Sequence, residues 1–117
     1  MREAVIVATA RTPIGRAFRG AFNNTPAQML GGHVIAEVVS RGKVSPREVE
    51  DVVIGAALQQ GSTGFNVGRQ SALRAGLPTS VAGMSIDRQC ASGLMAIATV
   101  AKEIVQDGLQ IGVGGGL

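Results

Sequence analysis

The stretch DRQCASGLMAI, residues 87–97, contains the only cysteine of the chain, Cys90. It follows a short polar run and precedes a long apolar one, so we predict that Cys90 lies where a strand ends and a helix begins. The first turn of a helix presents unpaired backbone N–H groups and a partial positive charge. Both favour a thiolate, and the same N–H groups can stabilise an oxyanion. The position therefore indicates a nucleophile, placed like the serine of a nucleophile elbow.

A second interpretation of Cys90 stays open. A lone cysteine in an intracellular protein is usually a small buried apolar side chain, and no partner base is visible near Cys90 in the sequence. His33, the only histidine, falls off the apolar stripe of its expected helix and four residues before Glu37. We expect a solvated pair between these two residues and no catalytic role for His33. A single cysteine excludes an internal disulfide and a cysteine-based zinc site, and we expect no metal.

The elements that must position Cys90 alternate along the chain. Apolar or alternating runs predict strands at 4–10, 51–58, 82–87 and 111–116. Helical spacing predicts helices at 26–41, 66–76 and 91–107, with a short helical turn after Ser45. We expect Thr25, Ser45 and Gly108 to cap or stop these helices. The order β-α-β-α-β-α-β predicts an α/β fold with a mostly parallel sheet and helices on both faces.

Two of these elements carry further expectations. The helix 91–107 is apolar nearly all round as far as Ala101, so we expect it to be buried, with Cys90 at its inner end. The strand 82–87 places Gly83 and Ser85 on one face, which permits the close approach of another backbone. The glycine-rich end at 113–116 lacks the residues of a phosphate-binding loop, and we interpret it as close backbone packing.

Composition limits the classes of function. The chain has 117 residues, of which 45% are apolar and 16% charged, with a net charge of +3. Its cations are scattered and it has no Trp or Tyr, which argues against a nucleic-acid platform. We interpret Arg11, Arg16 and Arg19 as a solvated loop rather than a phosphate clamp. No run suits a membrane span or a signal peptide, so we expect a soluble, cytoplasmic protein.

At this point the residues suggest a family. The segment around Cys90 resembles the nucleophile segment of the thiolases, the acetyl-CoA acetyltransferases and 3-ketoacyl-CoA thiolases. The similarity extends over essentially the whole chain. It is carried, in order, by AVIVATARTPIGRAFRGAF, DVVIGAALQQG, NVGRQSALRAGLP, DRQCASGLMAI and DGLQIGVGGG.

The resemblance implies a thiolase-like fold and a mechanism. Cys90 would take an acyl group from an acyl-CoA or a 3-ketoacyl-CoA, and its backbone N–H would contribute to an oxyanion hole. Attack by CoA on the acyl-cysteine is thiolysis, and attack by an acetyl-CoA enolate is Claisen condensation. CoA is a substrate or product here, and no metal or dissociable cofactor is implied. The resemblance also implies a homodimer or homotetramer with the strand 82–87 near a twofold interface, and a place for Arg69 and Gln70 beside the interface or the Cys90 loop.

The sequence also departs from the thiolase pattern. The family activates its nucleophile with the His of a Gly-His-Pro segment and uses a second Cys near a Cys-x-Gly segment, and neither is present. We therefore expect residues 1–117 to be the first part of a thiolase N-terminal domain, truncated and inactive alone, with the rest absent or on a companion chain.

Three alternatives stay open. One is a degradative thiolase for longer 3-ketoacyl chains, and another is a non-catalytic thiolase-fold fragment or subunit. The third, a thiol redox sensor, needs an exposed sulfur or a resolving cysteine, and the expected burial of the helix argues against it.

Overall fold

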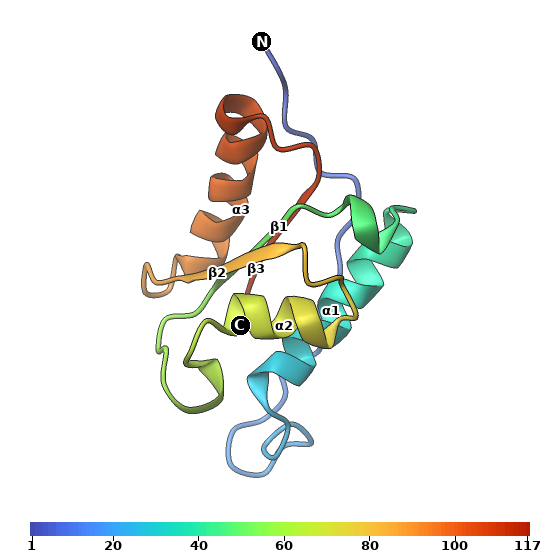
Figure 1. Cartoon of the computed structure of the whole chain (residues 1–117). Helices are drawn as coiled ribbons and strands as arrows, with labels where there is room; N and C mark the ends of the chain where they lie inside the picture. Colours follow the sequence, from blue (N-terminus) through green and yellow to red (C-terminus); the bar gives the residue numbers. More distant parts are fainter.

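Three parallel strands form one sheet in the computed structural model, which describes all residues from Met1 to Leu117. The strands are β1 (Asp51–Gly55), β2 (Ala82–Ile86) and β3 (Gly112–Gly116), in the spatial order β2-β1-β3. In the register, Val53 of β1 faces Met84 on one side and Gly114 on the other. Helices cover both faces of this sheet (Figure 1). The predicted α/β class with a parallel sheet is confirmed.

The central strand β1 is buried on both faces, which explains its continuous apolar sequence. Val52 and Ile54 join the larger core cluster, on the side of α1 (Ala27–Arg41) and α2 (Val67–Arg74). Val53 points to the opposite side and packs in a smaller cluster with Ala96 and Val100 of α3 (Ser92–Lys102). The sheet is therefore a middle layer between the α1–α2 pair and the single helix α3.

Several local signals act as predicted. Ser45 forms a capping box with Glu48 around a short 3-10 turn, Pro46–Glu48. The long C-terminal helix is α3 followed by a π-helical turn, Glu103–Asp107, and it stops at Gly108 with a φ of 84°. That left-handed φ suits glycine because glycine has no Cβ.

The predicted cap of the first helix is wrong. The helix α1 begins at Ala27, its cap position is Pro26, and no side chain caps it locally. The N–H of Ala27 instead donates to the hydroxyl of Ser62, 3.2 Å away. A residue of a distant turn, Gly61–Thr63, thus takes the role expected of Thr25, and no local pattern could reveal this.

The predicted N-terminal strand is also wrong. Residues 4–10 are extended but belong to no strand, and Val5, Ile6 and Val7 expose 70%, 75% and 73% of their surface. Figure 1 shows this segment passing the sheet without joining it. The Arg41 side chain donates to the Thr9 carbonyl at 2.9 Å. An apolar β-branched run favours a buried strand, but a strand needs a sheet edge to supply its hydrogen bonds, and this segment pairs with neither edge strand, β2 or β3.

None of the helices combines the length and the hydropathy needed to cross a bilayer.

Candidate functional site

The connection between β2 and α3 holds Cys90 at the point predicted from the sequence. The strand ends at Ile86, the helix begins at Ser92, and Cys90 lies two residues before the helix with its side chain exposed. The positional prediction is confirmed. The chemical role of Cys90 remains a prediction.

A set of short hydrogen bonds shapes this connection. The Asp87 carboxylate accepts the N–H of Gln89 at 2.8 Å. The Ser92 hydroxyl accepts the N–H of Arg88 at 2.8 Å and donates to the carbonyl of Gln89 at 2.6 Å. Gln89 itself has a φ of 52°, in the left-handed region that non-glycine residues rarely adopt. The turn is thus a specific conformation held by side chains. Asp87, already bonded to the backbone, is not placed as a base for Cys90.

One backbone N–H beside the sulfur is free of protein acceptors. Ala91 and Ser92 donate to the carbonyls of Arg88 and Gln89, whereas the N–H of Cys90 donates to none. Such an N–H can donate to an oxygen that gains negative charge during a reaction. The site therefore combines a thiol with a backbone hydrogen-bond donor.

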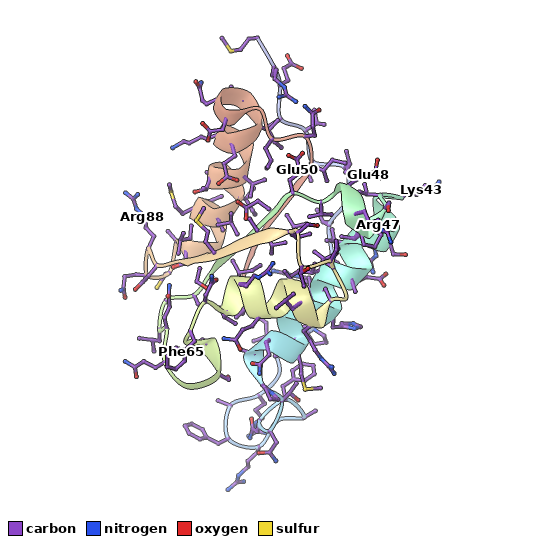
Figure 2. All side chains as sticks on the ribbon, viewed as in Figure 1. Lys43, Arg47, Glu48, Glu50, Phe65 and Arg88 are labelled. Atoms are coloured by element: carbon purple, nitrogen blue, oxygen red, sulfur yellow. The ribbon has the colours of Figure 1, made fainter.

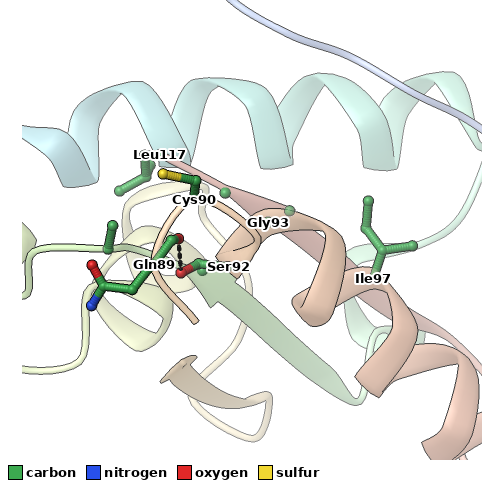
Figure 3. Close-up of a pocket in the computed structure, with 10 residues that line it drawn as sticks. Gln89, Cys90, Ser92, Gly93, Ile97 and Leu117 are labelled. Carbon is green, nitrogen blue, oxygen red and sulfur yellow. Dashed lines mark hydrogen bonds between the residues drawn. The ribbon is translucent and has the colours of Figure 1, made fainter. Parts of the chain in front are cut away.

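An open cleft of about 440 Å³ lies over this turn (Figure 3). Figure 3 shows Cys90 and Leu117 toward one end of the cleft and Ile97 farther along α3. The lining residues are Gly55, Ala57, Gln89, Cys90, Ser92, Gly93, Ile97, Gly115, Gly116 and Leu117. None of them is His, Asp, Glu or Lys, so the cleft has a nucleophile but no side chain suited to serve as a general base.

Glycines let the start of α3 rest directly on the strand ends. A Cβ added at Gly55 would lie 2.2 Å from the carbonyl carbon of Ser92, and one at Gly116 would lie 2.8 Å from the Cα of Gly93. Farther along, a Cβ at Gly114 would lie 2.8 Å from the Cα of Ile97. The interpretation of the glycine-rich strand end as close backbone packing is confirmed.

The expectation that this helix is buried all round is wrong. Ala96 and Val100 face the sheet, but Leu94 and Ile97 expose 73% and 41% of their surface. Cys90 is exposed rather than at an inner end. The reason is that α3 is the only helix on its face of the sheet, so its outer side has no packing partner (Figure 1). The exposed sulfur also removes the burial argument against a redox role.

The small face of β2 does permit close backbone approach, as expected, but the backbone is that of α2. The hydroxyl of Ser85 accepts the N–H of Gly68 at 3.0 Å, and a Cβ at Gly83 would lie 2.7 Å from the Cα of Arg69. The Asn66 side chain donates to the Gly83 carbonyl at 2.9 Å. An interface between subunits at β2 would therefore use the open edge of the strand rather than this face.

Arg69 and Gln70 hold neighbouring loops and do not contact the Cys90 turn in any hydrogen bond. Arg69 donates to the carbonyls of Val81 and Thr79, just before β2. Gln70 donates to the carbonyls of Gly64 and Phe65 at 2.9 and 2.8 Å. Figure 2 shows Phe65 on a loop that projects from the body of the molecule. The two residues thus anchor the loop before α2 and the loop before β2.

Other candidate residues have structural surroundings. The expected pair of His33 with Glu37 is wrong, because Glu37 binds Arg41 at 2.7 Å, one turn farther on. A guanidinium is always charged and can bind a carboxylate with two parallel N–H donors. His33 is exposed, as are Arg11, Arg16 and Arg19, in agreement with a solvated loop.

Ser92 is the functional candidate that sequence reasoning missed. It is buried, and it bonds to the two residues before Cys90. A signal was present in the sequence, since a serine at the start of an expected helix commonly bonds to the backbone nearby.

Comparisons with known proteins agree with the geometry. The model of the family described as thiolase, N-terminal domain, matches residues 4–117. An acetyl-CoA acetyltransferase of Cupriavidus necator is 41% identical over 116 residues, which cover 99% of this chain and 29% of that protein. A 3-ketoacyl-CoA thiolase of Colwellia psychrerythraea is 37% identical over 106 residues, which cover 90% of this chain and 28% of that protein. The chain thus spans less than a third of the length of these relatives.

Proposed function

The chain belongs to the thiolase family, and from this premise we propose that it supplies the acyl-accepting cysteine of an acyl-CoA acyltransferase. The observation that carries the proposal is the position of Cys90, exposed on an ordered turn and next to a backbone N–H without an acceptor. The names of the relatives, acetyl-CoA acetyltransferase and 3-ketoacyl-CoA thiolase, suggest the substrates.

The proposed first step is acyl transfer to sulfur. The Cys90 thiolate attacks the thioester carbonyl of acetyl-CoA, and a tetrahedral oxyanion forms near the Cys90 N–H. The C–S bond to CoA then breaks, CoA leaves as a thiolate that takes up a proton, and an acetyl thioester remains on Cys90. With a 3-ketoacyl-CoA, sulfur attacks the keto carbon, the bond to the α-carbon breaks, and that carbon takes a proton to give acetyl-CoA. A covalent intermediate divides one difficult transfer into two easier ones.

The second step needs groups that the cleft does not hold. CoA must lose its thiol proton to attack the acyl-cysteine, or acetyl-CoA must lose an α-proton to form an enolate. The cleft is lined by no histidine or carboxylate. We propose that residues 1–117 act as the first part of a thiolase N-terminal domain, with the bases supplied by a companion segment. The share of the relatives that the chain spans supports this proposal.

The partners follow from the same proposal. We expect acyl-CoA substrates and CoA, no nucleic acid and no metal, and a homodimer, a homotetramer or a complex with a companion chain in the cytoplasm. The open edge of β2 and the exposed apolar residues at the N-terminus are available for such contacts. The relatives of the two names have similar identities to this chain, 37% and 41%, so the identities do not favour one acyl chain length or one direction of the reaction.

Mass spectrometry tests the acyl-acceptor role directly. We expect incubation with acetyl-CoA to add one acetyl group to the chain, on the peptide that contains Cys90. Because Cys90 is the only cysteine, Cys90→Ala leaves no thiol and is expected to abolish the adduct. Ser80→Ala, a change at an exposed hydroxyl before β2, is the matched control and is expected to acetylate like the wild type. Acetylation of the Cys90→Ala chain, or none of the wild type, would refute the proposal and favour a non-catalytic subunit.

A further inference from the structure

We propose that Ser92 is the positioning residue of this site: its hydroxyl fixes the direction in which the Cys90 N–H points. The inference rests on the proposed function, in which that N–H stabilises an oxyanion. Ser92 is only 4% exposed, and its hydroxyl has two partners: it accepts from the Arg88 N–H at 2.8 Å and donates to the Gln89 carbonyl at 2.6 Å. Figure 3 shows the bond between Ser92 and Gln89.

The link between Ser92 and the Cys90 N–H is the peptide bond between Gln89 and Cys90. A trans peptide is planar, and its C=O and N–H point in opposite directions. The chain has no cis peptide bond. The Gln89 carbonyl is held on the helix side by both the Ser92 hydroxyl and the Ser92 N–H, at 2.6 and 3.0 Å. The N–H of the same peptide, that of Cys90, must then point away from the first turn of α3.

Nothing else in the chain holds this N–H. It donates to no protein acceptor, and Gln89 has a φ of 52° that a glutamine does not adopt readily by itself. Without the hydroxyl, the turn loses the bond from the Arg88 N–H and one of the two bonds to the Gln89 carbonyl. The peptide before Cys90 then keeps only the bond from the Ser92 N–H and is held less firmly, although the thiol stays exposed.

The anchor of Ser92 is the sheet itself. Its backbone lies so close to β1 that a Cβ on Gly55 would come within 2.2 Å of its carbonyl carbon. Ser92 therefore packs on the end of β1 through its backbone and bonds to the Cys90 turn through its hydroxyl, so the turn is held at a fixed place relative to β1. A residue that only capped a helix would stabilise α3 but would have no effect on a specific chemical step at Cys90.

The test compares two reactions at the single thiol. Acylation by p-nitrophenyl acetate passes through a tetrahedral oxyanion, whereas alkylation by iodoacetamide displaces iodide at a saturated carbon and forms none. We expect Ser92→Ala to lower the ratio of the acylation rate to the alkylation rate about tenfold, since misdirecting an oxyanion donor costs part of what removing it costs. Ser92→Thr keeps the hydroxyl and is expected to retain most of the ratio. Ser92→Val, which has the size of threonine but no hydroxyl, is expected to lower the ratio as Ser92→Ala does. An unchanged ratio in Ser92→Ala and Ser92→Val would overturn the proposal.

Amide hydrogen exchange separates this inference from the proposed function. We expect the Arg88 amide to exchange faster in Ser92→Ala and Ser92→Val than in the wild type and Ser92→Thr, while the amides of β1 keep their protection. Failure of the wild type to acylate would refute the proposed function. The exchange rate of the Arg88 amide would then still show whether Ser92 holds the turn. Equal exchange rates in the wild type and the three Ser92 variants would overturn the positioning role of Ser92 too.

Discussion

At the scale of single residues, the chain concentrates its unusual features in the turn before α3. Gln89 has a left-handed backbone, Ser92 is a buried hydroxyl with two partners, and Cys90 carries the only thiol. Figure 2 shows Arg88 at the edge of this turn, and its guanidinium lies 3.8 Å from the sulfur of Met95 on α3. Unusual backbone conformations persist only where the surroundings over-determine them, and here the side chains of Asp87 and Ser92 bond to the backbone of the turn.

A second residue of note lies at the other end of the same helix. One carboxylate oxygen of Glu103 is buried without a hydrogen-bond partner. Burial raises the pKa of Glu103 above its ordinary value, and the nearby Asp51 and Asp107 raise it further. The folded chain therefore holds a proton at pH values where the unfolded chain has released it. The free energy of unfolding therefore falls as the pH rises above 4.5, the ordinary pKa of the group. At pH values above the raised pKa of the folded chain, Glu103 is ionised in both states, and the loss of stability no longer changes with pH.

We predict that Glu103→Gln stabilises the chain at pH 7 and that this gain disappears below pH 4.5. Glutamine has nearly the same shape but carries no charge to bury. Urea unfolding of both chains at a series of pH values measures the difference. Glu3→Gln, which removes the same charge from an exposed site, is the control and is expected to change stability little at any pH. A Glu103→Gln chain less stable than the wild type at pH 7 would contradict the assignment.

At the scale of elements, the site depends on how closely a helix can approach two strand ends. The ends of β1 and β3 at the cleft are glycines, and the first turn of α3 packs on their backbone. Side chains at Gly55 or Gly116 would push the helix outward and move the turn that carries Cys90. The neighbouring Gly115 differs, since a Cβ there would meet only Ile54 at an ordinary 3.7 Å.

This contrast gives a matched pair of substitutions. We predict that Gly55→Ala destabilises the chain by about 1–3 kcal/mol, because its Cβ would collide with backbone that can move only with the whole helix. Gly115→Ala, at the same cleft, is expected to change stability by no more than about 0.5 kcal/mol. Circular dichroism during urea unfolding checks both. Equal losses in the two variants would mean that the helix and sheet do not meet as described.

At the scale of the whole molecule, the chain holds only part of the proposed chemistry. It has a nucleophile and a backbone donor on one side of an open cleft, and no base faces them. The outer face of α3 carries exposed Leu94 and Ile97, and the apolar N-terminal segment is also uncovered. These surfaces are available to cover and complete the site.

We predict that the 117-residue chain alone shows no thiolysis of acetoacetyl-CoA in the presence of CoA. A positioned acid or base typically contributes about 10²–10⁴-fold to the rate, and here the groups that would deprotonate CoA or shuttle a proton to the leaving carbon are missing. A spectrophotometric assay of acetoacetyl-CoA loss measures this, with one acetylation of Cys90 as the positive control for a folded site. Sustained turnover by the chain alone would refute the proposed division of the chemistry.

The sequence by itself determined the order of most elements and the place of Cys90. Local signals suffice for these: the apolar run of β1 and the capping box at Ser45 depend only on neighbouring residues. The family resemblance to thiolases also followed from linear motifs.

Only the tertiary structure decided which surfaces meet. The run at 4–10 has the composition of a strand but pairs with neither edge of the sheet, and α3 has the composition of a buried helix but only one covered face. In the same way Ser62 caps a helix 35 residues away, and the small face of β2 receives α2. The physical reason is common to all four. Composition specifies that a surface should be buried or bonded, whereas the partner that buries or bonds it is set by the packing of residues distant in the chain.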